Sequence, residues 1–166
     1  MSRYRPPVAS STPIISAQGF RVLQAEQKQL WVKRREVTAA LSAAAAEGDR
    51  SENAEYIYRK KELREIDRRV RYLQKRLASL KVVTELPNDQ SLVFFGATVK
   101  LEDEDGSVSQ LRIVGPDEID PSKNWISIDS LMAKALLKSA VEDEIVVKAP
   151  RGETEYSVIE IFYEPY

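Results

Sequence analysis

The chain of 166 residues is 43% hydrophobic and 31% charged, which is typical of one or two small soluble domains. It contains no Cys and no His, which excludes disulfides, thiolate metal sites and any catalytic imidazole. The net charge of −1 conceals a division, because residues 1–83 hold 18 Lys and Arg against 9 Asp and Glu, whereas residues 84–166 hold 7 against 17. The two halves are therefore expected to be modules with different partners, the basic half meeting an anionic one.

The N-terminal segment, residues 1–15, is predicted to be a flexible tail. It contains Arg3 and Arg5, several Pro and Ser residues, and no apolar stretch of the kind found in a signal peptide. No run anywhere in the sequence approaches the roughly 18 apolar residues that a membrane-spanning helix needs. We therefore expect a cytoplasmic protein without membrane contact.

Residues 16–83 are predicted to form two helices folded into an antiparallel coiled-coil finger. Apolar residues recur in alternating steps of three and four, provided that Gln27 and Arg34 occupy two seam positions of the first helix. The second helix shows the same spacing with fewer polar interruptions. The apolar seam residues are Phe20, Leu23, Leu30, Val37, Leu41 and Ala44 in the first helix and Tyr56, Leu63, Ile66, Val70, Leu73, Leu77 and Leu80 in the second.

The acidic stretch "EGDRSENAEY" between the two helices allows two interpretations. Gly48 is suited to end the first helix, and Asp49 with Glu52 matches the capping box of a second helix, which is worth about 1 kcal/mol. Alternatively, two carboxylates on a first helical turn point to one side and suit Mg²⁺, although two ligands are too few for a stable site of their own. Spacing alone favours the capping interpretation.

The second helix is strongly basic, with nine Lys and Arg in residues 59–76 against three acids. Such a face can be a solvated coiled-coil surface with intrahelical ion pairs. The excess of positive charge also suits a phosphate backbone, and with few aromatic residues nearby such a contact would tolerate many sequences and weaken with salt.

Residues 84–91 are predicted to be a linker, and residues 92–166 a small antiparallel sheet with one helix. The linker contains Pro87 and no seam residue. Beyond it, apolar and polar residues alternate with a period of two, and "DEDG" is typical of a hairpin turn. The segment "SLMAKALLK" predicts a short helix with Ser130 as its N-cap. The fold class is therefore α+β.

Five stretches together resemble the Gre transcript cleavage factors of bacteria, and the GreB branch in particular. They are "GDRSENAEY", "RKKELREIDRRVRYL", "FFGATV", "RIVGPDEI" and "ISIDSLMAKALLK". The resemblance covers about residues 13–166. It implies an N-terminal coiled coil with an acidic tip and a C-terminal FKBP-like domain, residues 92–166, that binds RNA polymerase.

The resemblance also implies a function. Family members place the C-terminal domain at the rim of the polymerase secondary channel, insert the coiled coil, and stimulate the polymerase's own Mg²⁺-dependent cleavage of backtracked RNA 3′ ends. The chain would then be a monomeric cofactor and not an enzyme, with Mg²⁺ bound only within the polymerase complex.

Site residues implied by the resemblance fall into four groups. The carboxylates that share the second Mg²⁺ with polymerase are Asp49 and Glu52, supported at the tip by Arg50, Ser51 and Asn53. The set implied to contact backtracked RNA is Arg59, Lys60, Lys61, Arg64 and Arg68. The polymerase-binding loop is Asp129, Ser130 and Leu131, where the family commonly has Asp-Ser-Pro.

The sequence also allows two other kinds of function, a regulator that binds polymerase without promoting cleavage and an independent enzyme. A secondary-channel regulator could occupy the same site without promoting cleavage, although the presence of both Asp49 and Glu52 argues against it. An independent nuclease would have too few metal ligands and no His, and a prolyl isomerase would have too few aromatic residues to build an apolar pocket.

Overall fold

The computed structural model describes residues 10–166, so most of the expected flexible tail lies outside the described residues. The chain divides into two compact units. The hairpin unit comprises residues 18–80, and the sheet unit comprises residues 81–166 with the N-terminal segment that ends at Ala17. Among the described residues, no helix has an apolar stretch long enough to cross a membrane.

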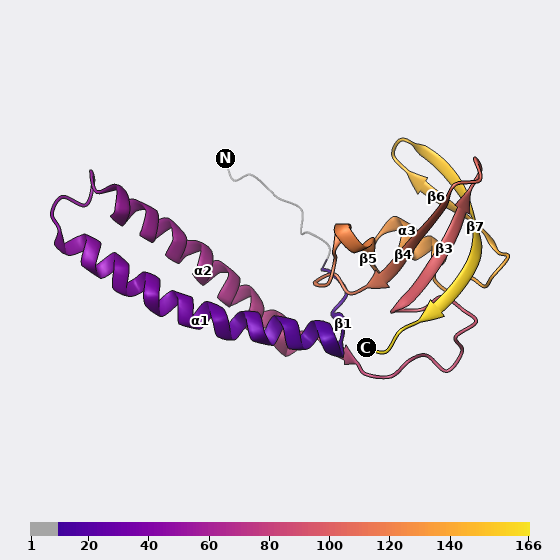
Figure 1. The fold of residues 1–166 in the computed structure, drawn as a ribbon, viewed down its shortest axis with the longest axis horizontal. Coiled ribbons are helices and arrows are strands. Elements are labelled where there is room, and N and C mark those ends of the chain that lie inside the picture. The colour runs from indigo at the N-terminus through magenta and orange to yellow at the C-terminus, as the bar shows by residue number, and fades with distance from the viewer. Residues whose placement is uncertain (1–9) are drawn as a thin grey trace, which may run out of the picture. The chain divides into compact units, whose positions relative to one another are not determined.

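The hairpin unit consists of α1 (Ala17–Ala46) and α2 (Ala54–Ser79), which run side by side in opposite directions (Figure 1). All thirteen apolar residues predicted for the seam are buried or half-buried, which confirms the heptad pattern. Arg34 also lies half-buried in the seam, where its Nε donates a hydrogen bond of 2.6 Å to Asp67 Oδ1 of α2. The polar interruption predicted in the first helix is thus matched by an acid in the second.

A short parallel strand pair was not predicted. Strand β1 (Ile14–Ser16) pairs with β2 (Lys81–Val83), with Ile15 opposite Val82. Ile15 is fully buried, so the prediction of a flexible tail is wrong for residues 14 and 15. Three residues are too few to display a period of two, and the partner strand is far away in the sequence, so no local pattern indicated this pairing.

The sheet unit contains a five-stranded sheet in the order β5-β4-β3-β7-β6. Helix α3 (Leu131–Leu136) contributes Ala133 and Leu136 to its core, which confirms the α+β class with one helix against a sheet. The sheet is antiparallel as predicted, except that β5 runs parallel to β4. Its strands are β3 (Ala97–Asp103), β4 (Val108–Val114), β5 (Trp125–Ser127), β6 (Glu144–Ala149) and β7 (Gly152–Tyr163).

The connections of the sheet unit follow the predicted turn chemistry. Gly106, with φ of 78°, occupies the turn between β3 and β4, a conformation that favours glycine. Residues 84–91 contain no helix or strand. The helical turn η1 (Pro121–Lys123) precedes β5, and Asp120 caps it. The loop before α3 contacts the segment just before β1 in the same unit, since Asp129 accepts hydrogen bonds from Thr12.

Candidate functional site

The turn between the helices, residues 47–53, has a glycine as its second residue, and the backbone conformation there explains it. Gly48 has φ of 132°, and nothing lies within 4 Å of where a Cβ would stand. The glycine is therefore required by the backbone conformation and not by a close neighbour. As predicted, it allows the chain to leave α1, which ends two residues earlier at Ala46.

The N-cap of α2 is Asn53, so the prediction of an Asp49–Glu52 capping box is wrong. Asn53 Oδ1 accepts a hydrogen bond of 3.1 Å from the Tyr56 backbone N–H. Both Asp and Asn are good N-caps, and the sequence offers the two at positions four apart. Because α2 begins at Ala54, Asp49 and Glu52 precede the helix, and the predicted first-turn arrangement of the two acids is also wrong.

Asn53 is fastened to both helices. Besides capping α2, its side-chain amide donates a hydrogen bond of 2.9 Å to the carbonyl oxygen of Ala44, in the last turn of α1. The last carbonyls of a helix have no partner within the helix, so this bond satisfies one of them. One side chain thereby connects the two ends of the turn that carries the acids.

Asp49 is held by Ser51. Its Oδ1 accepts hydrogen bonds from the Ser51 backbone N–H at 2.9 Å and from the Ser51 hydroxyl at 2.8 Å. These two hydrogen bonds, of which the one from the backbone N–H has the larger effect, hold the pKa of the Asp49 carboxyl below its usual value, so the group is ionised at neutral pH. Within residues 10–166, no hydrogen bond reaches Asp49 Oδ2.

The tip acids do not form a complete metal site by themselves. Asp49 and Glu52 are both exposed. In the described part of the chain, no group of three or more His, Cys, Asp or Glu side chains is placed to hold a metal ion. Their carboxylate oxygens are nevertheless the ligand type that Mg²⁺ accepts, one or two at a time, when other ligands complete its coordination. The donors therefore fit a shared site.

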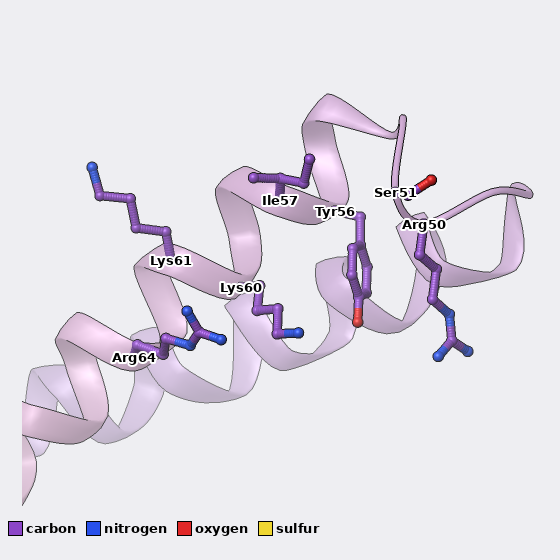
Figure 2. Close-up of a pocket in the computed structure, with 7 residues that line it drawn as sticks. All are labelled: Arg50, Ser51, Tyr56, Ile57, Lys60, Lys61 and Arg64. Atoms are coloured by element: carbon purple, nitrogen blue, oxygen red, sulfur yellow. The ribbon is translucent and has the colours of Figure 1, made fainter.

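A basic hollow of about 660 Å³ lies beside the tip (Figure 2). Tyr56 lies between Arg50 and Lys60, whose charged ends are 5.8 Å and 5.7 Å from the centre of its ring. Both distances are within the range of cation–π attraction. The hollow is lined by Arg50, Ser51, Tyr56, Ile57, Lys60, Lys61 and Arg64.

The positive charge of this basic hollow is not neutralised by any acid of the described residues. Within residues 10–166, no carboxylate lies within ion-pairing distance of Arg50, Lys60, Lys61 or Arg64. Figure 2 shows Lys61 extending away from the other three cations. The hollow can therefore attract an anion, chiefly through Arg50, Lys60 and Arg64.

The remaining basic residues predicted to contact RNA have different surroundings. Arg59 is paired with two acids of its own helix, Glu55 at 2.8 Å and Glu62 at 3.0 Å. Its charge is thus balanced locally, as the solvated-face interpretation expects. Arg68 is exposed one turn beyond Arg64 and does not line the hollow.

The predicted polymerase-binding loop lies in the sheet unit. Asp129 accepts hydrogen bonds from Thr12, and the Ser130 hydroxyl accepts one of 3.1 Å from the Ala133 N–H, which confirms Ser130 as an N-cap. The Leu131 side chain is exposed. Ser130 borders a groove of about 540 Å³ whose apolar walls are Leu111, Ile119, Pro121, Trp125 and Ile126.

Two family models together match most of the chain. One, described as "Transcription elongation factor, N-terminal", matches residues 13–82, and the other, described as "Transcription elongation factor, GreA/GreB, C-term", matches residues 87–163. The chain belongs to the GreA/GreB family of transcription elongation factors. The resemblance noted in the sequence is therefore confirmed.

Curated relatives of this GreA/GreB-family chain are named transcription elongation factor GreB. The protein of Pseudomonas aeruginosa is 57% identical over 166 residues, with 99% of each chain covered. That of Xanthomonas axonopodis is 56% identical, with 98% of each covered. Solved structures include Gfh1 of Thermus thermophilus, at 24% identity and a TM-score of 0.42, with 90% of this chain and 97% of that chain covered.

The structure brings some predicted site residues of this family member together and adds others. Ser51 contacts Asp49 and also lines the basic hollow with Arg50. Tyr56 was predicted as a seam residue and as one of the few aromatic residues near the basic face, but not as a site residue, although its position four residues before Lys60 places both on one helix face. Thr12, the partner of Asp129, carries no sequence signal, because the two residues are 117 positions apart.

Proposed function

We propose that this GreA/GreB-family chain binds RNA polymerase through its secondary channel and stimulates the polymerase's own Mg²⁺-dependent cleavage of backtracked RNA 3′ ends. Relatives named GreB at more than half identity support the general role. The observation that carries the specific role is Ser51, which holds ionised Asp49 on one side and lines the basic hollow on the other. An acid suited to a metal thus adjoins cations suited to RNA phosphates.

The tip residues would act by positioning charge. Arg50, Lys60 and Arg64 would attract the phosphates of the extruded RNA, with Arg68 extending the basic surface along α2. Asp49, ionised and held through one carboxylate oxygen, would direct the other toward Mg²⁺, and Glu52 would provide the second carboxylate. A Mg²⁺ ion held by these two carboxylates and by polymerase would supply a water of lowered pKa and stabilise the charge of phosphoryl displacement.

The chain itself would not be an enzyme. Two carboxylates leave most of the coordination of Mg²⁺ to be supplied by other ligands, which the polymerase would provide. A stable metal complex of the free protein is therefore not expected. The requirement for a borrowed site also implies that the factor works as one copy per polymerase, consistent with a monomer.

The experiment is a transcript-cleavage assay on purified backtracked polymerase complexes with labelled RNA. We expect wild-type protein to release a 3′ fragment. Asp49→Asn and Glu52→Gln should each lower the rate by at least roughly 10- to 100-fold, because that is the usual cost of losing a residue that only supports a metal ligand, and these two residues are proposed as ligands. Glu47→Gln is the matched control, because Glu47 is an exposed acid of the same turn outside the proposed pair.

The outcomes separate the candidate functions. A chain that binds polymerase and releases no fragment would be a channel-binding regulator. Equal activity of Asp49→Asn and wild type would refute the metal role of the tip. Cleavage of RNA without polymerase would show that the chain is an enzyme.

A further inference from the structure

Strand β1 is fastened to the sheet unit at both ends by carboxylates. Two residues before its start, Asp129 Oδ2 accepts a hydrogen bond of 2.8 Å from the Thr12 N–H, and Oδ1 accepts one from the Thr12 hydroxyl. At its end, Glu118 accepts hydrogen bonds from the N–H and the hydroxyl of Ser16. The Glu118 carboxylate also accepts a bond of 3.1 Å from the Gly115 N–H.

The backbone around β1 is closely fitted. A Cβ on Gly115 would stand 2.2 Å from the carbonyl oxygen of Ile14, so only glycine allows this approach. Ile15 is fully buried between the two carboxylate anchors. The position of β1 therefore depends on the loops that carry Glu118 and Asp129, and the second of these is the loop predicted to bind polymerase.

The polar groups of that loop are used within the protein. The Asp129 N–H donates to Ser127 Oγ at 3.0 Å, and the Ser130 N–H donates to the Ser127 carbonyl at 2.9 Å. The Ser130 hydroxyl caps α3, and both carboxylate oxygens of Asp129 are bonded to Thr12. What the loop exposes to solvent is the side chain of Leu131, which is 55% exposed and follows Ser130, a residue that borders the apolar groove.

We propose that Asp129 is a positioning residue, which supports polymerase docking through Thr12 by fixing β1 and the shape of its own loop, while Leu131 makes the direct contact. This inference rests on the proposed function, since it assigns roles within the polymerase-binding loop. Loss of the Asp129 carboxylate would leave two donors of Thr12 without their partner in a partly buried place. The loop would then lose its shape without losing any contact to polymerase.

The test is a double-mutant cycle on polymerase binding. Thr12→Val keeps the shape of Thr12 and removes its hydroxyl, and Asp129→Ala removes both acceptors. The measurement is the concentration of fluorescently labelled full-length factor that half-saturates polymerase. If Asp129 acts through Thr12, we expect Thr12→Val to raise this concentration roughly 3- to 10-fold, as for one lost hydrogen bond. Asp129→Ala should then cost less in the Thr12→Val background than alone.

Direct contact between Asp129 and polymerase predicts the opposite pattern. Thr12→Val would be neutral, and Asp129→Ala would cost the same in both backgrounds, which would overturn the proposal. Thr12→Ser, which retains the hydroxyl, should bind as wild type. Leu131→Ala should weaken binding by itself, and wild-type binding of this variant would also overturn the assignment.

Hydrogen exchange on the free protein tests the anchor without polymerase. Amides of residues 14–16 should exchange faster in Thr12→Val and Asp129→Ala, and at the wild-type rate in Leu131→Ala. Unchanged exchange in Asp129→Ala would refute the anchor. Failure of wild-type protein to bind polymerase would instead refute the proposed function, so the two failures are distinguishable.

Discussion

Asn53 offers the sharpest test of how the tip is built, because its side chain makes two separable hydrogen bonds. Asn53→Ala removes the cap of α2, worth about 1 kcal/mol. It also leaves the Ala44 carbonyl without its 2.9 Å partner, at a cost of about 1 kcal/mol more. We therefore expect Asn53→Ala to destabilise the turn and the start of α2 locally by about 2 kcal/mol.

Asn53→Ser divides this total. A serine hydroxyl can still cap α2, but it is too short to reach the Ala44 carbonyl, so we expect a loss of about 1 kcal/mol. Native-state hydrogen exchange measures both values at the amide of Tyr56, which donates to Asn53, and at that of Ile57. Amides near the middle of α2, such as that of Val70, are the internal control and should be unchanged.

The same variants connect the structure of the turn with its proposed role. If the turn orients the acids, transcript cleavage should fall for both variants while the half-saturating concentration of factor stays constant. Wild-type exchange at Tyr56 in Asn53→Ala would refute the capping assignment. Full cleavage activity in a variant with accelerated exchange would show that the order of the turn is irrelevant to the acids.

Two further predictions concern charge at the tip. Ser51→Ala removes one of the hydrogen bonds that lower the pKa of Asp49, so this pKa should rise toward its usual value and the carboxylate should become protonated at a higher pH. An NMR pH titration of the Asp49 carboxyl carbon measures this pKa, and an unchanged midpoint would contradict the prediction. Lys60→Ala should reduce the slope of the logarithm of RNA affinity against the logarithm of salt concentration by about one unit. Arg59→Ala should change this slope much less, because the charge of Arg59 is already paired with two acids, and equal effects of the two variants would contradict this distinction.

Much of the fold could be predicted because its signals are periodic and local. Every apolar residue that the heptad pattern placed in the seam is buried or half-buried, as is Arg34 at its polar position, and Ser130 was recognisable as a cap from its own neighbourhood. The partner of Arg34 was not recognisable, because Asp67 is one of several acids on α2 and only the pairing of the helices selects it. Strand β1 and the carboxylates that bind its two ends were not predicted for the same reason, since they depend on residues far away in the sequence.

The basic residues of the site could be identified from sequence as a set but not ranked. Five cations were predicted to contact RNA, and the sequence treats them alike. The structure separates them by their neighbours, because Arg59 has two acids within reach while Lys60 and Arg64 face the hollow without any among the described residues. Local charge balance, which depends on side-chain positions, therefore decides which cations remain available to an anion.

The role of Asn53 also changes how the acidic tip is interpreted. In the sequence, a structural explanation for Asp49 and Glu52 competed with a functional one, because a capping box would have used both acids to stabilise α2. With Asn53 as the cap, the helix needs neither acid. Asp49 has one local structural role, which is to accept two hydrogen bonds from Ser51 through Oδ1, and its other carboxylate oxygen takes no part in these bonds. The cap of α2 therefore gives no reason for Glu52 to be acidic. Its replacement by Gln should change the hydrogen exchange of α2 by no more than the small helix-dipole effect of an exposed carboxylate, even where transcript cleavage is lost.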